Sequence, residues 1–356
     1  MDFPFFNTKE LGNGKTYDLN DPVGRKEYFQ VKLGSKIEEI KEFLEENTFV
    51  AFLLAKKSAG KGTYSKMFQE IFGADRAAHL SVGDLVRDTH KKIGDEKFRN
   101  ELVLYLGKNY RGFMSIEETV DSLLGRSQEK LLPTEFILAL VKREIESIGR
   151  KALFIDGLPR NLDQISYSLY FRDLINFRED PDFFVLIDVP ESVIDERMKF
   201  RVVCPECQTS RSTKLLPTKF VEYDKEKKDF YLLCDNEKCT GCGKTRMVRK
   251  EGDEKGIEPI RERLQTDAKL MEMATKLQGV PKILVRNSMP VKDALANAEE
   301  YELTPEYTYK VGSDGKVIVE TKPWTIKDDS GVESHSLLAP AALVSLVAQM
   351  HKILVG

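Results

Sequence analysis

Residues 55–63 read AKKSAGKGT, and this short stretch constrains the fold more than any other part of the sequence. The apolar run FVAFLL leads into it, and KGTYSKMFQEIF follows with apolar residues at helical spacing. A strand, a tight turn and a helix in this order are typical of a phosphate-binding loop, whose backbone N–H groups and helix N-terminus face phosphate oxygens. The candidate phosphate-binding residues are Ser58, Ala59, Gly60, Lys61, Gly62 and Thr63.

Two positions depart from the usual composition of such a loop. Ala55 stands at the first glycine position, and alanine cannot adopt a positive φ without a cost. Ser58 stands where a further glycine is expected. Because the second half of the loop is intact, we interpret both residues as tolerated variation, with the affinity for a phosphate donor as the property that they would alter.

Four further apolar segments predict strands at 77–84, 151–156, 182–189 and 281–285. Helical patterns lie between them, for example at 135–148 and 191–201. Short apolar strands that alternate with helices favour a parallel sheet covered on both faces. The sequence therefore predicts an α/β fold of the P-loop type, with a five-stranded parallel sheet flanked by helices.

Two segments interrupt this alternation, and both ends of the chain extend beyond it. The predicted division is an N-terminal extension at 1–45, a core at 46–87, 131–197 and 264–300, a polar helical insertion at 88–130, a cysteine-bearing lid at 198–263 and a C-terminal extension at 301–356. The last of these contains a predicted hairpin that turns at Ser313-Asp314-Gly315, and then an apolar helix at 336–350 that we expect to be buried.

The composition limits the classes of partner. The net charge is −3, with 41% hydrophobic and 32% charged residues, so no overall basic field attracts nucleic acid or an anionic membrane. No run of about 18 apolar residues is present to span a membrane. The first residues lack the pattern of a signal peptide. We expect a cytoplasmic protein that binds neither membrane nor nucleic acid.

Five cysteines lie within 39 residues, at 204, 207, 234, 239 and 242. Clustering with C-x-x-C spacing indicates a metal site rather than a disulfide scaffold. Cys204 and Cys207 form one pair, and Cys239 and Cys242 form a second. Four thiolates suit a closed, structural zinc site. We therefore predict these four as zinc ligands. Cys234 is the spare: it is either a buried thiol or a replacement for Cys239, and the second role would need an unusual spacing.

Several motifs follow the loop in a fixed order, and together they resemble one family. They are HLSVGDLVRD (79–88), LFIDGLPRNLDQ (153–164), VPESVIDERMKFR (189–201), the two cysteine pairs and IRERL (260–264). The set is similar to nucleoside monophosphate kinases, and most closely resembles adenylate kinases with a long, zinc-bearing lid. The resemblance covers about 46–90, 131–207 and 239–295.

The resemblance also implies a role for individual residues. Lys61 and the loop would hold the phosphates of the donor, and Gln164 would read an adenine base. The arginines implied at the acceptor are Arg87 and Arg160, and those implied around the transferring phosphoryl group are Arg197, Arg201, Arg249 and Arg263. Asp156 would anchor Mg²⁺ through water, and Asp84 is a second acidic candidate whose alternative role is a helix N-cap.

These roles predict Mg²⁺-dependent phosphoryl transfer from ATP to AMP by a monomer, with closure of the lid. The acceptor stays open, because Val82, Asn287 and Met289 depart from residues usual in adenylate kinases, and UMP or CMP is the alternative. A second hypothesis is a non-catalytic nucleotide-binding protein whose zinc ribbon contacts a partner or nucleic acid.

Overall fold

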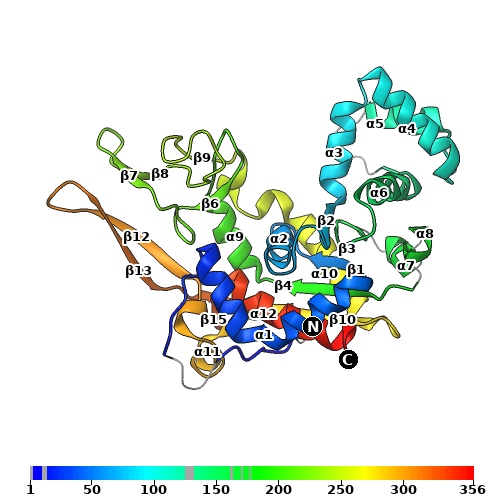
Figure 1. The fold of residues 1–356 in the computed structure, drawn as a ribbon. Coiled ribbons are helices and arrows are strands. Elements are labelled where there is room, and N and C mark those ends of the chain that lie inside the picture. The colour runs from blue at the N-terminus through cyan, green and yellow to red at the C-terminus, as the bar shows by residue number, and fades with distance from the viewer. Residues whose placement is uncertain are drawn as a thin grey trace.

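The computed structural model has a five-stranded parallel sheet at its centre (Figure 1). Its strands are β1 (Val50–Ala55), β2 (Ala77–Ser81), β3 (Ala152–Asp156), β4 (Asp182–Asp188) and β10 (Lys282–Arg286). They lie in the order β10-β4-β1-β3-β2, and each neighbouring pair is parallel. The predicted sheet and its five strands are confirmed.

The residues that the structure describes are 3–9, 14–124, 132–160, 163–169, 171–175, 177 and 179–356. The predicted boundary between the insertion and the core, at residues 130 and 131, lies outside them. The other predicted domain limits remain predictions.

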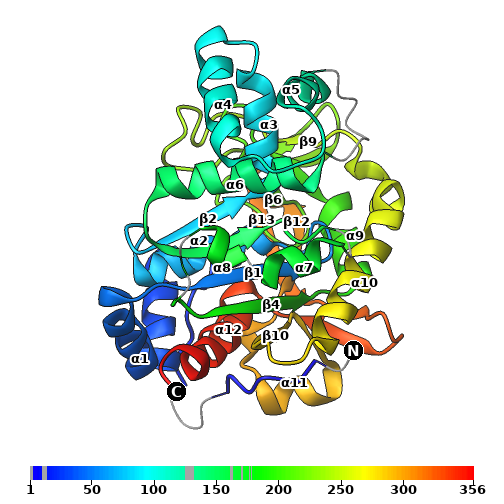
Figure 2. The ribbon, with the colours of Figure 1, turned by 90° about the vertical axis from the view of Figure 1, so that its right-hand side faces the viewer.

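The side chains of β1 alternate between two hydrophobic cores, so helices cover both faces of the sheet. Val50, Phe52 and Leu54 pack on one face, together with α6 (Thr134–Ile148), α8 (Phe171–Leu174) and the second half of α10 (Arg261–Lys276). The alternate residues pack on the face formed by α1 (Pro22–Glu46), α2 (Lys61–Phe72) and α12 (Ala339–Leu354). Figure 2 shows α6 on one side of β1 and α1 and α12 on the other.

Two excursions rise from the same side of the sheet, with α2 between them (Figure 1). The first follows β2 and contains α3 (Val82–Lys92), α4 (Glu96–Asn109) and α5 (Ile116–Leu124). The second follows α9 (Glu191–Lys199) and contains β5 (Arg201–Val203), β6 (Ser210–Ser212), β7 (Val221–Asp224), β8 (Asp229–Leu232) and β9 (Val248–Arg249). This second excursion lies within the predicted lid at 198–263, and from here on "the lid" means residues 201–249.

The remaining elements are short. They are α7 (Asp163–Leu169), three 3-10 turns (Asp253–Lys255, Glu258–Ile260 and Glu300–Glu302), β11 (Ser288–Pro290), α11 (Val291–Asn297), β12 (Pro305–Val311), β13 (Val317–Pro323), β14 (Ile326–Lys327) and β15 (Glu333–Ser336). The β12–β13 pair is the predicted hairpin, and its turn is closed by a hydrogen bond from Gly312 N to Lys316 O. The predicted C-terminal apolar helix is α12, which is buried along most of its length.

The hairpin lies against the lid. Tyr309 Oη donates a hydrogen bond to Thr213 O at 2.5 Å, and the Tyr309 ring centroid is 5.5 Å from that of Phe230 on β8. Tyr307 N donates to Lys214 O at 2.8 Å. The C-terminal extension therefore supports the outer part of the lid as well as completing the core.

A buried carboxylate joins the two ends of the chain. Glu302 is fully buried and accepts hydrogen bonds from Tyr28 Oη and Thr8 Oγ1, both at 2.6 Å. Its Oε1 also lies 3.6 Å from Lys32 Nζ, whose side chain is 4% exposed. A charge this far from water requires partners of this kind, because burial without them is strongly unfavourable.

We expect the substitution Glu302→Ala to reduce the free energy of unfolding by about 3–5 kcal/mol, because it leaves the buried Lys32 ammonium without its carboxylate. Chemical denaturation measures this change. The neighbouring Glu300 is exposed, so Glu300→Ala is the control and should stay within about 0.5 kcal/mol of the parent. Equal losses in the two variants would contradict a role for the buried network.

Candidate nucleotide-binding site

The loop between β1 and α2 has its left-handed residues at Ser58 and Gly60, with φ of 65° and 92°. Gly60 is also the N-cap of α2. Ala55 instead ends β1 as an ordinary strand residue. The need for a glycine-like conformation therefore falls on Ser58 and not on Ala55, and for a serine this conformation costs roughly 1–2 kcal/mol.

Lys61 and Asp156 meet where β1 and β3 end. The register pairs Leu53 with Asp156, so the loop after β1 begins beside this carboxylate. Lys61 Nζ lies 3.6 Å from Asp156 Oδ1 and donates a hydrogen bond to Ala55 O at 3.1 Å. Both charged side chains remain partly exposed, at 16% and 23%. The edge thus presents an ammonium and a carboxylate that are both accessible.

Asp267 on α10 fastens the loop from the other side, and sequence reasoning missed it. Its Oδ2 accepts a hydrogen bond from Lys57 N at 2.8 Å, and its Oδ1 lies 2.8 Å from Arg263 Nη2. Burial raises the pKa of Asp267, and the adjacent Arg263 opposes that shift. The spacing of Arg263 and Asp267, four residues apart on a helix, was the available signal.

Arg87 and Arg160 converge on the backbone of Gly83, in the first turn of α3. A Cβ added at Gly83 would lie 2.7 Å from Arg160 Nη2 and 3.4 Å from Arg87 Nη1. Because Gly83 has no side chain, the Arg160 guanidinium occupies the space where a Cβ would lie, and the Arg87 guanidinium lies next to that space. Two like charges held this close favour the binding of an anion between them.

Asp84 and Gln164 both hold these arginines. Asp84 forms an ion pair with Arg87. The N-cap of α3 is Ser81, whose Oγ accepts from Asp84 N at 3.3 Å, so the alternative of Asp84 as the cap is wrong. Gln164 is buried, and its Oε1 accepts from Arg160 N at 2.7 Å while its Nε2 donates to Thr134 Oγ1 at 3.1 Å.

A cavity of about 770 Å³ joins the loop to the two converging arginines. The predicted site residues that line it are Ser58, Lys61, Arg87, Asp156, Arg160 and Arg263. Asp267 and Lys57 also line it. The cavity therefore unites residues from four segments of the sequence, 53–61, 81–91, 156–160 and 263–271.

Three predicted arginines do not line this cavity. Arg201, which begins β5, makes two hydrogen bonds to the carboxylate of Asp253, at 2.5 and 2.7 Å. Arg249 is exposed on β9. Arg197 on α9 donates through Nη2 to the side-chain oxygens of Asn287, at 3.0 Å, and Ser336, at 3.2 Å. In this conformation the structure brings together the loop and acceptor-side residues but not these three.

Four thiols in the lid gather closely enough to bind one metal ion. They belong to Cys204, Cys207, Cys234 and Cys239, and their sulfur atoms all lie within 4.8 Å of one another. The sulfur atoms of Cys204 and Cys239 are 4.0 Å apart, and those of Cys207 and Cys234 are 3.7 Å apart. Tetrahedral zinc with Zn–S bonds of about 2.3 Å requires sulfur atoms about 3.8 Å apart. The donor set therefore fits zinc.

This group corrects the predicted ligand set, because Cys234 takes the place assigned to Cys242. Cys234 follows β8 and is fixed by two backbone hydrogen bonds, from its own N to Thr245 O and from Gly243 N to its O. These bonds fold the segment after β8 back over the first cysteine pair. Burial raises the pKa of Cys234 to about 12, whereas hydrogen bonding to Thr209 lowers that of Cys207 to about 6.

The chain is similar to known proteins along much of its length, although no protein-family model matches it. It is 31% identical to an adenylate kinase of Thermotoga petrophila over 211 residues, which is 59% of this chain and 76% of the relative. It is 30% identical to an adenylate kinase of Thermotoga neapolitana over 234 residues, 65% of this chain and 86% of the relative. The chain belongs to the adenylate kinase family of nucleoside monophosphate kinases. A probable UMP-CMP kinase of Arabidopsis thaliana is 28% identical over 172 residues, 48% of this chain and 55% of the relative.

Membership of the adenylate kinase family agrees with the parallel sheet, the loop and the cavity. The alignments with these relatives cover about two thirds of the chain or less, so the remainder is not matched in them. Among the described residues, none of the helices combines the length and the apolar character that crossing a membrane requires.

The corrected cysteine set gives a direct prediction. We expect Cys234→Ser to lose bound zinc and to lower the unfolding temperature of the lid, because a thiolate ligand is replaced by a poor one. Cys242→Ser should keep one zinc per chain, and Cys204→Ser, which belongs to both ligand sets, should lose it. Elemental analysis of the purified variants, with thermal unfolding, measures both quantities. Zinc that is retained by Cys234→Ser and lost by Cys242→Ser would restore the original set.

Proposed function

We propose that this protein transfers the terminal phosphoryl group of ATP to a nucleoside monophosphate, with AMP as the first choice. The observation that carries the proposal is the convergence of Arg87 and Arg160 on Gly83, in the same cavity as Lys61. A loop alone would suit many nucleotide-binding proteins. A second anion site that opens into the same cavity is what phosphoryl transfer between two nucleotides requires.

The donor phosphates would bind at the N-terminus of α2. Backbone N–H groups of Ser58, Gly60 and Gly62 would face the phosphates there, and the helix dipole favours an anion. The N–H groups of Ala59 and Thr63 already donate to Lys56 O and Gly60 O, at 3.1 and 2.8 Å, and would have to exchange these bonds for phosphate oxygens. Lys61 Nζ, which now contacts Ala55 O and Asp156, would exchange these contacts for the β- and γ-phosphates. The loop is already held in shape by Asp267, so little backbone reorganisation is needed.

Asp156 is the residue that would hold Mg²⁺, through water molecules. Its carboxylate supplies the oxygen donors that this hard cation prefers, and it stands beside Lys61 at the edge of the sheet. The bound ion would neutralise charge that develops on the phosphates during transfer. Asp84 already forms an ion pair with Arg87, so it is the weaker candidate for binding Mg²⁺.

Arg197, Arg201, Arg249 and Arg263 would surround the transferring group. Arg263 already lines the cavity, whereas Arg201 and Arg249 belong to the lid. Closure of the lid would bring these guanidinium groups to the phosphates and exclude water, which otherwise competes as the phosphoryl acceptor. Zinc would stabilise the lid and take no part in the chemistry.

AMP is preferred because of Gln164, since an amide can both donate to and accept from an adenine edge. To do so, the Gln164 amide would exchange its present contacts with Arg160 N and Thr134 Oγ1 for the base. UMP or CMP remains the second candidate. One reason is that Val82 is fully buried and presents no hydroxyl to the acceptor. The other is the similarity of this chain to the probable UMP-CMP kinase over 172 residues.

A coupled assay with Mg-ATP and each of AMP, CMP, UMP and GMP tests the proposal. We expect the highest kcat/KM with AMP, and at least a hundred-fold lower kcat when Lys61 is replaced by Met, because one charge contact to the phosphates is lost. Tight binding of ATP without turnover of any of the four acceptors would support the non-catalytic hypothesis. Preference for UMP or CMP would reassign the acceptor.

A second prediction separates affinity from stability at the acceptor side. In Gly83→Ala the new methyl would displace the flexible end of Arg160, so we expect KM for AMP to rise about ten-fold, which corresponds to one charge-assisted hydrogen bond. KM for ATP should stay within about two-fold. Stability should be equal or higher, since alanine favours a helix over glycine by up to about 1 kcal/mol.

Gly94→Ala is the matched control, because a Cβ at Gly94 meets nothing within 4 Å. It should leave both KM values unchanged in the same assay. An unchanged KM for AMP in Gly83→Ala would show that the two guanidinium groups do not form the acceptor phosphate site.

A further inference from the structure

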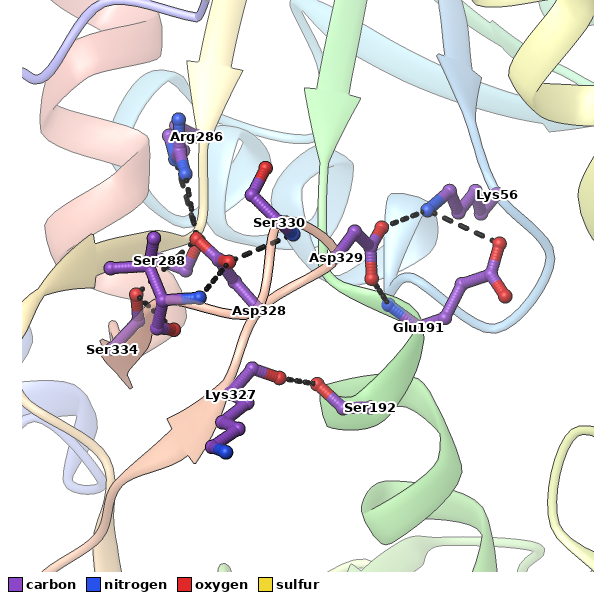
Figure 3. Close-up of polar contacts among 11 residues, drawn as sticks. Lys56, Glu191, Ser192, Arg286, Ser288, Lys327, Asp328, Asp329, Ser330 and Ser334 are labelled. Carbon is purple, nitrogen blue, oxygen red and sulfur yellow. Dashed lines mark hydrogen bonds and ion pairs between the residues drawn. The ribbon is translucent and has the colours of Figure 1, made fainter.

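The C-terminal extension caps α9, the helix that carries Arg197. The N-cap position of α9 is Pro190, which supplies no side-chain hydrogen bond. Asp329 Oδ1 instead accepts a hydrogen bond from Glu191 N at 2.7 Å, and Ser192 Oγ donates to Lys327 O at 2.6 Å (Figure 3). A residue almost 140 positions away thus satisfies the helix terminus.

Asp329 also reaches the phosphate-binding loop. Its Oδ2 lies 2.5 Å from Lys56 Nζ, and the same ammonium is 3.4 Å from Glu191 Oε1. Figure 3 shows Lys56 facing both carboxylates, with Asp328 turned the other way towards Arg286. Asp328 Oδ1 accepts from Ser330 N and Val332 N, each at 2.9 Å, so the turn that presents Asp329 is internally bonded.

A second contact from the extension falls on Arg197 itself. Ser336 Oγ, on β15, accepts from Arg197 Nη2 at 3.2 Å and donates to Asn287 Oδ1 at 3.0 Å. The same Asn287 oxygen accepts from Arg197 Nη2 at 3.0 Å. The Asn287 amide is fixed in turn, because its Nδ2 donates to Leu337 O at 2.9 Å. Ser336 and Asn287 are both almost completely buried.

The charge of Arg197 is not matched by these partners. Arg87, Arg201 and Arg263 each pair with an aspartate, whereas within the described part of the chain Arg197 bonds only to neutral oxygens. Burial lowers the pKa of Arg197, while the residue retains partial exposure. A desolvated guanidinium without a carboxylate is costly to hold, and an anionic ligand would offset that cost.

We propose that Ser336 is a positioning residue of the donor site, which orients the guanidinium of Arg197 for the donor nucleotide. This inference rests on the proposed phosphoryl-transfer function. It makes the C-terminal extension part of the active site, because Ser336 acts through Arg197 while Asp329 fixes the start of the same helix.

The test compares two serines on the same strand. Ser334 and Ser336 are both fully buried on β15, but the Ser334 hydroxyl faces Asp328 and Val332 O instead of Arg197. We expect Ser336→Ala to lower kcat/KM for Mg-ATP about ten-fold, as for the loss of one hydrogen bond to a charged group, and to leave KM for AMP unchanged. Ser334→Ala should stay within two-fold of the parent for both nucleotides.

A double-mutant cycle distinguishes positioning from a general structural role. Ser336→Ala introduced into an Arg197→Ala background should cause no further loss in kcat/KM for Mg-ATP. The same ten-fold loss in both backgrounds, or no loss in Ser336→Ala alone, would overturn the proposal. If Ser336→Ala does not fold, Ser336→Cys keeps the side-chain volume, supplies a poorer acceptor and is read in the same way.

The outcome is separable from the proposed function. Calorimetric titration with Mg-ATP measures donor affinity without turnover, so the same four variants of the cycle can be compared even if no acceptor is phosphorylated. Absence of turnover in the parent protein would reject the kinase function alone. Equal affinity of the parent and Ser336→Ala for Mg-ATP, together with equal kcat/KM where turnover exists, would reject the positioning role alone.

Discussion

The parallel pairing of β1 with β3 is the constraint on which the rest of the site depends. It aligns Leu53 with Asp156, so the loop and the acidic strand end leave the same edge of the sheet together. The carboxyl ends of parallel strands meet at one edge, and the segments that follow β1, β2 and β3 carry Lys61, Gly83 and Arg160. A slip of one residue in that register would turn every side chain of β1 to the opposite core.

The lid depends on a different kind of constraint. Its hydrophobic core consists of only six buried side chains, of which three are cysteines. The six are Val202, Cys204, Leu232, Cys234, Cys239 and Met247. So small a core cannot hold a fold of about fifty residues by itself. Metal binding would supply the missing free energy, and the hairpin of the C-terminal extension adds contacts to the same module from outside.

The elements that the sequence predicted correctly depend on local patterns. The strand-loop-helix of 49–72 and the five strands are visible as short apolar runs, and the hairpin is visible from its turn residues. The placement of Cys234 was not predictable in this way, because it depends on backbone bonds to Gly243 and Thr245 and on contact with a pair 27 residues earlier. Spacing alone favoured Cys242. Likewise, Ala55 was suspected of strain that the structure assigns to Ser58.

Contacts between distant segments also explain why the extensions had no assigned purpose in the sequence. Glu302 accepts hydrogen bonds from Thr8 and Tyr28 near the N-terminus. Asp329 contacts the phosphate-binding loop through Lys56, and Ser336 contacts α9 through Arg197. None of these contacts leaves a periodic pattern. Electrostatics nevertheless gives them a common feature: Lys56 and Arg197, like Lys61 and Arg263 in the cavity, each contact specific protein oxygens. Under the proposed function, phosphates would replace such contacts. Such fixed polar groups need little reorganisation when the substrate binds, which is the condition under which electrostatic stabilisation of phosphoryl transfer is most effective.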